Sequence, residues 1–300
     1  MILIIGGTGR LGSEAVRLLS TSGLHKIRVM SRDPVKAAFL ARPGVEIISG
    51  GITDPKLLDQ AMRSVERVLV IPPNLRNQAE VERSIYKSAR HAGVSQIVKV
   101  STVKANSNST CHFFREHANA EKYLETSGVR ATILRTNSFM QNLIWFAGEM
   151  RSKSTLSLPM GDAKTAPVDI RDVGAVAAAI LSGQIHDGIT YHVTGPEMHS
   201  FSDIVKELSK AIGKEVEYRD VAPAEFLETL IMSGVPNWYA RAVAAAWAIA
   251  REGKPKITNV VLEIAKKNPI TLEQFARDYA GAFLCQKGEA HQPSAKVMEC

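Results

Sequence analysis

Cysteine is scarce in this chain. Three cysteines occur in 300 residues, at positions 111, 285 and 300, far apart in the sequence. This spacing does not suggest a disulfide framework and matches no zinc-ligand pattern, so we expect neither disulfides nor a bound metal. A reducing, cytoplasmic setting fits such a composition.

Long apolar runs and dense basic runs are also missing. No stretch reaches the roughly 18 apolar residues that a membrane-spanning helix needs, so we expect no membrane partner. The opening MILIIGG lacks the basic segment of a secretory signal. The formal net charge is +7, but the lysines and arginines are scattered. This distribution argues against nucleic-acid binding and is typical of a solvated surface that mildly favours anionic ligands.

Between residues 2 and 135, short apolar runs alternate with helical segments. The runs are rich in β-branched residues, as is typical of parallel strands buried on both faces. They are ILII, KIRVMS, VEIIS, RVLVIP, QIVKVS and RATILR. Two Asp-Pro pairs, at 33–34 and 54–55, predict helix starts. Six strands with five intervening helices predict an α/β fold, a Rossmann-type doubly wound parallel sheet.

After residue 135 the alternation gives way to a smaller, mainly helical part. The sequence predicts helices over 137–150 and 169–183, a short strand within 152–168, a further strand in ITYHVTG and mostly helix from 200 onward. We therefore expect an NAD(P)-binding domain of residues 1–155 plus 169–195, a smaller substrate-binding part of residues 156–168 and 196–285, and a flexible tail over 286–300.

The most informative motif is GGTGRLG, which follows the first strand and opens a helix. Gly6, Gly9 and Gly12 have the G-x-x-G-x-x-G spacing of a dinucleotide-binding turn. Gly6 permits the tight turn, Gly9 lets the backbone approach a pyrophosphate, and Gly12 allows close helix packing. The phosphates would lie at the positive end of the helix. Thr8, Arg10 and Leu11 complete this expected cofactor contact.

The residues at the end of the second strand distinguish a site for NAD from a site for NADP. An NAD site usually places Asp or Glu there to bind the ribose 2′-hydroxyl. This chain has Ser31 and Arg32, with Lys36 one turn into the next helix, and Asp33 is explained as that helix's N-cap. A guanidinium can bind a 2′-phosphate with paired hydrogen bonds, so the sequence favours NADP over NAD.

The motifs occur in an order that resembles a known family. Read along the chain they are the three glycines, SRDP, GGITDP, QIVKVS, LRTNSFMQN and PVDIRDVGAVAAAIL. The chain resembles the NmrA-like branch of the atypical short-chain dehydrogenase/reductases, in the style of NAD(P)H:quinone oxidoreductases and triphenylmethane-dye reductases. The similarity covers residues 1 to about 285. The family often has Asp where this chain has Gly51, which weakens the transfer of its adenine pocket.

The resemblance implies further contacts. The expected cofactor contacts lie after the third, fourth and fifth strands: Asp54, Ile71, Pro72, Pro73, Ser101 and Thr102. The expected substrate cleft follows the sixth strand: Asn137, Phe139, Met140 and Asn142. Asp169 and Asp172 resemble the family's structural carboxylates, which cap the following helix, and are not expected in the site.

The helix that begins near residue 112 departs from the usual dehydrogenase pattern. Short-chain dehydrogenases generally place Tyr-x-x-x-Lys there, and this chain has Phe113 and His117 at that spacing. Phenylalanine cannot donate a proton, so carbonyl reduction by the Tyr/Lys route is not supported. Atypical members carry EH…E instead, here Glu116, His117 and Glu121. His117 is therefore the candidate catalytic residue and a candidate cofactor ligand.

These features predict an NADPH-dependent oxidoreductase. Without a strong acid, hydride transfer suits conjugated acceptors such as quinones, iminium ions, dyes or enones. Phe113 and Trp238 are expected to contact a flat substrate. A non-enzymatic NADP(H) sensor that regulates a protein partner, and a biosynthetic reductase or cyclase, stay open, as does the choice between monomer and homodimer.

Overall fold

The computed structural model describes residues 1–284, so the predicted tail lies outside the described part. Its centre is a parallel seven-stranded sheet in the order β3-β2-β1-β4-β5-β6-β8. The strands are β1 (Ile2–Ile5), β2 (Ile27–Ser31), β3 (Val45–Ser49), β4 (Arg67–Val70), β5 (Gln96–Thr102), β6 (Ala131–Thr136) and β8 (Ile189–Val193). The predicted doubly wound α/β fold is confirmed.

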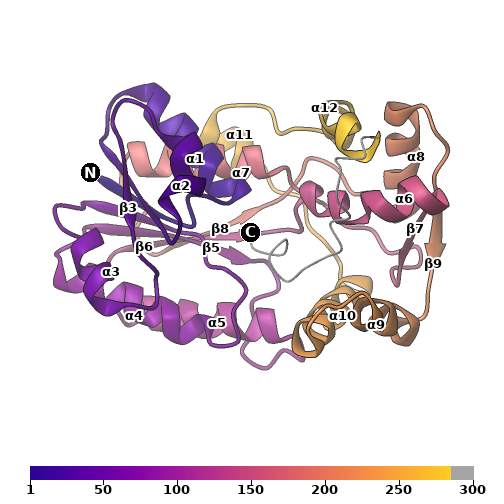
Figure 1. The fold of residues 1–300 in the computed structure, drawn as a ribbon, viewed down its shortest axis with the longest axis horizontal. Coiled ribbons are helices and arrows are strands. Elements are labelled where there is room, and N and C mark those ends of the chain that lie inside the picture. Colours follow the sequence, from indigo (N-terminus) through magenta and orange to yellow (C-terminus); the bar gives the residue numbers. More distant parts are fainter. Residues whose placement is uncertain (285–300) are drawn as a thin grey trace.

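Helices cover both faces of the sheet (Figure 1). One apolar core lies between the sheet and the helices α1 (Arg10–Ser22), α7 (Ile170–Ser182) and α11 (Val260–Ala265). The opposite core includes side chains from α3 (Pro55–Ala61), α4 (Gln78–His91) and α5 (His112–Glu125). Burial on both faces is the reason why the central strands β1 and β4 read as continuous apolar runs.

The predicted helix starts are seen at both Asp-Pro pairs. Asp33 caps α2 (Pro34–Ala37), which continues as the 3₁₀ helix η1 (Ala38–Leu40), by accepting from the Lys36 N–H. Asp54 caps α3 by accepting from the N–H groups of Lys56 and Leu57. A short carboxylate at the N-cap satisfies amides that have no partner within the helix.

The remaining described elements form a separate apolar core, called the second core below to distinguish it from the two cores that flank the sheet. Its elements are the 3₁₀ helix η2 (Met140–Phe146), α6 (Ala147–Lys153), β7 (Thr155–Leu158), α8 (Phe201–Ile212), β9 (Glu217–Asp220), α9 (Pro223–Met232), α10 (Asn237–Glu252) and α12 (Leu272–Leu284). β7 and β9 form a parallel two-stranded sheet. No helix within residues 1–284 is long and apolar enough to cross a membrane.

Two details differ from the sequence-based expectations. The helix expected over 137–150 is the 3₁₀ helix η2 followed by α6, because Phe139 is extended and bridges Val168. The strand β9, with the sequence EYRD, was not expected. Three of its four side chains are exposed, so it lacks the apolar alternation that predicts a strand.

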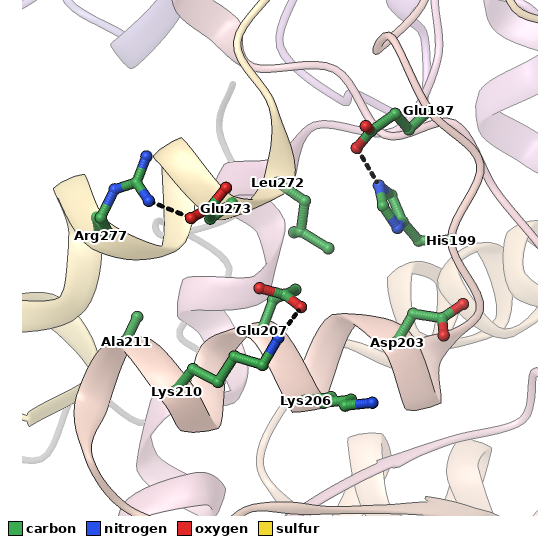
Figure 2. Close-up of a pocket in the computed structure, with 10 residues that line it drawn as sticks. All are labelled: Glu197, His199, Asp203, Lys206, Glu207, Lys210, Ala211, Leu272, Glu273 and Arg277. Atoms are coloured by element: carbon green, nitrogen blue, oxygen red, sulfur yellow. Dashed lines mark hydrogen bonds and ion pairs between the residues drawn. The ribbon is translucent and has the colours of Figure 1, made fainter.

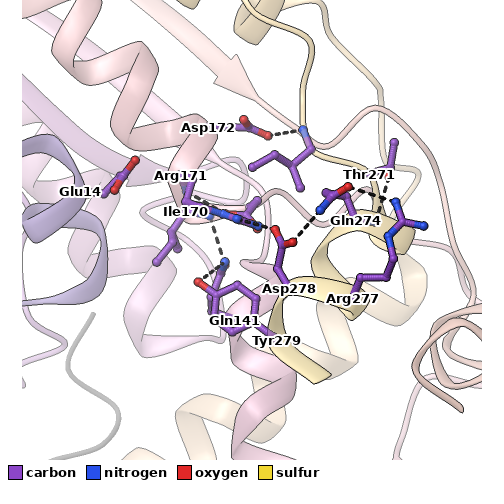
Figure 3. Close-up of polar contacts among 12 residues, drawn as sticks. Glu14, Gln141, Ile170, Arg171, Asp172, Thr271, Gln274, Arg277, Asp278 and Tyr279 are labelled. Carbon is purple, nitrogen blue, oxygen red and sulfur yellow. Dashed lines mark hydrogen bonds and ion pairs between the residues drawn. The ribbon is translucent and has the colours of Figure 1, made fainter. Parts of the chain in front are cut away.

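Polar contacts join α12 to the start of α7 (Figure 3). The Arg171 guanidinium lies 2.8 Å from the buried Asp169 carboxylate and 2.6 Å from Asp278 on α12. Asp172, also buried, accepts from the Ile270 N–H at 2.7 Å and pairs with Lys267. Asp169 and Asp172 therefore have structural partners at this joint.

Candidate functional site

The glycine-rich loop lies where β1 ends, beside β4. The strand order reverses between these two strands, and ligands of doubly wound sheets bind at such a point. Gly6 has a φ of +83°, and a Cβ there would collide with the Ile71 carbonyl oxygen. A Cβ on Gly12 would collide with the carbonyl oxygen of Gly6. Both positions therefore require glycine.

This loop fits the phosphates of a dinucleotide. Gly9 is the N-cap of α1 and supplies no side-chain hydrogen bond, and the first turn of α1 has no acidic residue. The helix therefore presents backbone N–H groups and a positive dipole end without a competing carboxylate. Arg10 donates to the Gln141 carbonyl oxygen at 3.3 Å, which connects the loop to η2. Thr8 is exposed, whereas Leu11 is buried in the core.

The turn after β2 is held by Ser31. Its Oγ accepts from the Asp33 N–H at 3.2 Å and donates to the Asp33 carbonyl oxygen at 3.0 Å. Arg32 is exposed, and its Cγ lies 3.8 Å from where a Cβ on Gly51 would be. The absence of a side chain at position 51 thus leaves room beside the Arg32 stem. Lys36 lies 3.6 Å from Asp33.

The residues that follow β4 connect the sheet to α10. Ile71 and Pro72 are buried and Pro73 is partly exposed. Asn74 then donates to the Tyr239 hydroxyl at 3.1 Å. Since α10 belongs to the smaller part, the expected cofactor edge and the expected substrate wall meet here.

At the end of β5, Ser101 and Thr102 have different surroundings. Ser101 is buried, and its Oγ donates to a Glu121 carboxylate oxygen at 2.5 Å. Arg135 pairs with the same carboxylate at 2.5 Å. The Ser101 hydroxyl is therefore engaged on the α5 side, whereas Thr102 is partly exposed.

The helix α5 places Phe113 and His117 in different environments. Phe113 is buried against Trp238 and Tyr239, with ring centroids 6.3 and 4.9 Å away. His117 instead faces a polar cluster, with its Nδ1 3.3 Å from the amide nitrogen of Gln78. Burial, and then the Lys99 ammonium, hold the pKa of His117 well below its usual value. At neutral pH we therefore expect His117 as the uncharged imidazole.

The other two members of the EH…E pattern, Glu116 and Glu121, form hydrogen bonds with groups other than His117. A Glu116 carboxylate oxygen accepts from the Ala79 N–H at 2.9 Å, near the start of α4. Glu121 binds Ser101 and Arg135, as above. Neither carboxylate is hydrogen-bonded to His117. Neither therefore forms a carboxylate–imidazole pair with it.

Trp238 contacts several groups from other elements. The His112 ring meets it edge-on with centroids 5.6 Å apart, and the Arg76 guanidinium lies 5.2 Å from its ring centre. The His112 Nε2 is buried without a hydrogen-bond partner within the described residues. This aromatic group lies at the junction of α5 and α10, where a flat substrate was expected.

The segment after β6 runs between the second core and the sheet core that contains α1, α7 and α11. Asn137 donates its N–H to the Val193 carbonyl at 3.0 Å, and Met140 donates to Val168 at 2.9 Å. Phe139 packs against the sheet core, whereas Met140 is buried in the second core. Asn142 is partly exposed. The segment thus joins the two parts, but its side chains do not all face one side.

A groove of about 640 Å³ lies elsewhere, between α8 and α12 (Figure 2). Its walls carry both charges: Lys210 forms an ion pair with Glu207, and His199 Nε2 lies 3.2 Å from a Glu197 carboxylate oxygen. None of the predicted site residues lines it. Within residues 1–284, no group of His, Cys, Asp and Glu side chains could hold a metal ion.

Sequence reasoning missed the polar cluster next to His117. Lys99 lies fully buried on β5 and pairs with the buried Glu82 of α4. One signal was available, because a lysine inside the apolar run QIVKVS would be buried wherever that run is a central strand.

Comparison with known proteins finds relatives that are named for NAD(P)H-dependent reduction. The model of the NmrA-like family matches residues 1–276. The NAD(P)H azoreductase of Xenophilus azovorans is 30% identical over 284 residues, covering 94% of this chain and 99% of that protein. Quinone oxidoreductase 2 of Escherichia coli strain K12 is 30% identical over 255 residues, covering 84% and 89%. The crystal structure of the NADPH-dependent quinone oxidoreductase QOR2 from Escherichia coli, complexed with NADPH, has a TM-score of 0.85 at 27% identity, covering 93% of this chain and 99% of that one.

Proposed function

The chain belongs to the NmrA-like family, and on that premise we propose that it is an NADPH-dependent oxidoreductase that reduces a conjugated small molecule. The observation that carries the proposal is the Gly6–Gly12 loop at the point where the strand order reverses. Side chains at Gly6 and Gly12 would fill the space that the turn needs, and α1 begins there without a side-chain cap.

The preference for NADPH rests on the turn after β2. Arg32 and Lys36 are exposed cations there, and Ser31 fixes the turn that carries them. A 2′-phosphate would be bound by the Arg32 fork and attracted by Lys36. Asp33 does not oppose this role, because its carboxylate caps α2.

The acceptor class follows from the groups on α5. The cofactor supplies a hydride when bound. By the family resemblance Phe113 stands where the usual tyrosine acid is found, and His117 is partly buried with a pKa well below its usual value. The substrate must therefore delocalise the incoming charge itself, as quinones, azo dyes, iminium ions and enones do. Two relatives are named for azo and quinone reduction, which supports this class.

The residues at the junction of α5 and α10 would hold the substrate. Trp238 offers an aromatic face that already stacks with the Arg76 guanidinium. A flat acceptor could displace Arg76 and lie between the indole and the nicotinamide end of the cofactor. Asn142, which is partly exposed, would border the same space from the segment after β6.

The test is to follow NADPH oxidation by the purified protein with a panel of quinones, azo dyes, iminium compounds and enones. We expect turnover with at least one of these classes, and slower turnover when NADH replaces NADPH. Tight NADPH binding without oxidation on any acceptor would contradict the enzyme proposal and favour a sensor that reports on the cofactor.

A further inference from the structure

A largely buried polar cluster lies between α4, β5 and α5 beside His117, and the proposed chemistry uses none of its other members. It consists of Gln78, Glu82 and Tyr86 on α4, Lys99 on β5 and His117 on α5. Lys99 is 0% exposed and Glu82 is 1% exposed. Burying an ion pair is costly, and apolar residues often fill such a space more stably. The cluster therefore calls for an explanation other than stability.

Glu82 holds three donors in fixed positions. Lys99 Nζ lies 2.5 Å from its Oε2, and the Tyr86 hydroxyl donates to the same oxygen at 2.5 Å. Burial, and then Glu82, raise the pKa of Tyr86 well above its usual value, so this hydroxyl stays a donor. Gln78 Nε2 donates to the other oxygen, Oε1, at 3.0 Å. The ammonium and the amide nitrogen are thereby held in place.

The orientation of Gln78 follows from this contact. An ionised carboxylate only accepts hydrogen bonds, so the amide nitrogen and not the amide oxygen must face Glu82. The same nitrogen lies 3.3 Å from His117 Nδ1. The amide oxygen is buried without a partner within the described residues, which is the cost of this orientation.

His117 Nδ1 consequently faces two groups that can only donate. Besides Gln78, the Lys99 Nζ lies 3.5 Å from it. An N–H at Nδ1 would point at both donors, so Nδ1 must be the acceptor and the single ring proton must lie on Nε2. The carboxylates of α5 do not change this, because Glu116 binds Ala79 and Glu121 binds Ser101 and Arg135.

We propose that Glu82, Lys99 and Gln78 are positioning residues that hold His117 in its neutral Nε2–H tautomer, so that it presents one fixed hydrogen-bond donor to an oxygen at the nicotinamide-riboside end of the dinucleotide. The tautomer rests on the contacts above alone. The ligand rests on the proposed function. Such a donor would orient the cofactor without acting as an acid, which agrees with acceptors that need no proton donor.

The tautomer can be measured without turnover. Two-bond ¹H–¹⁵N correlation spectra of the protein would report both ring nitrogens of His117, assigned by the signal that His117→Gln removes. We expect a protonated Nε2 and an unprotonated Nδ1 throughout the range of about pH 5 to 8, where an ordinary histidine titrates. A proton on Nδ1, or titration near the ordinary pKa, would overturn the proposal.

Variants separate the network from mere packing. The double variant Glu82→Gln/Lys99→Met removes both charges and keeps similar volumes, and circular dichroism would check its fold. We expect the His117 signal to titrate at least one pH unit higher in this variant, or to show both tautomers. Tyr86→Phe is the matched control, because it removes a donor to Glu82 but none to Nδ1, and it should leave the tautomer unchanged. An unchanged spectrum in the folded double variant would contradict the positioning role.

Two substitutions test the ligand. The amide nitrogen of His117→Gln can replace the Nε2 donor, whereas that of His117→Asn lies near the place of Nδ1. We expect the NADPH Kd to rise about threefold or less with Gln and about tenfold with Asn, the loss of one hydrogen bond. An equal rise in the NADPH Kd of both variants would exclude a donor role of His117 toward the cofactor. The tautomer result would still stand. Failure of the parent protein to bind NADPH would contradict the proposed function instead.

Discussion

At the scale of single residues, Arg32 carries the prediction of cofactor preference. It is the exposed guanidinium of a turn that Ser31 fixes. We expect Arg32→Asp to weaken NADPH binding by about 10- to 100-fold, since a charge-assisted hydrogen bond contributes about 1.5–3 kcal/mol. NADH binding should change little. Fluorescence titration of both cofactors measures this, with Arg219→Asp on β9 as the matched control. Equal affinity for NADPH in Arg32→Asp and the parent would refute the assignment.

Gly12 tests the shape of the phosphate loop. A Cβ there would collide with the Gly6 carbonyl, so Gly12→Ala should destabilise the fold by about 1–3 kcal/mol and weaken NADPH binding. Gly281, within α12, is a helical position where a Cβ would meet nothing within 4 Å. Gly281→Ala should therefore stabilise by up to about 1 kcal/mol. Urea unfolding measures the free energy of unfolding of both variants. An equal change in the two would contradict the collision inferred at Gly12.

His117 predicts a pH dependence of stability. Its pKa in the folded state lies well below the usual value, so the unfolded chain binds more protons as the pH falls below about 6.5. The contribution of His117 to the free energy of unfolding should be fully present above about pH 6.5 and decline below it, by at most about 1.4 kcal/mol per pH unit. His117→Gln should remove this part of the slope. Urea unfolding of both proteins between about pH 5 and 7.5 measures it, and identical slopes would speak against a depressed pKa.

At the scale of elements, the joint between α7 and α12 determines how the smaller part is held. Asp172 is fully buried and binds Ile270 and Lys267. Asp172→Ala leaves the Ile270 N–H and the Lys267 ammonium without this acceptor, which should cost about 1–3 kcal/mol. Limited proteolysis should then cut near α12 faster than in the parent. Arg277→Gln, an exposed change on the same helix, is the control and should have little effect.

Strands could be predicted from the sequence where burial imposes a run of apolar residues. The central strands of the large sheet were predicted because burial on both faces selects mainly apolar side chains, as in ILII. β9 was not predicted, because EYRD is mostly exposed and its pairing with β7 depends on a distant segment. The pairing of Lys99 with Glu82 was missed for the same reason, since it joins residues on different elements whose contact only the fold creates.

At the scale of the whole molecule, the expected site lies where the two parts meet. Asn74 after β4 contacts Tyr239 on α10, and Arg10 of the loop contacts η2. A ligand that binds there stabilises only the folded state. NADPH at 100 times its Kd should therefore add about 2.7 kcal/mol to the free energy of unfolding, with a smaller gain from NADH at the same concentration. Thermal unfolding with each cofactor measures this, and an equal rise in Tm would count against the NADPH preference.

The joint at α12 also bears on the order in which the chain is made. Gln141 accepts from the Ile170 N–H, and its amide nitrogen donates to the Tyr279 hydroxyl on α12. During synthesis the last strand of the large sheet emerges with residue 193, but α12 begins only at residue 272. A nascent chain stalled between these points can complete the sheet while Gln141 and Arg171 still lack their partners on α12 and the second core lacks its last helix. Dinucleotide binding by stalled ribosome complexes should therefore develop in two stages, with the full affinity reached only after α12 has left the exit tunnel.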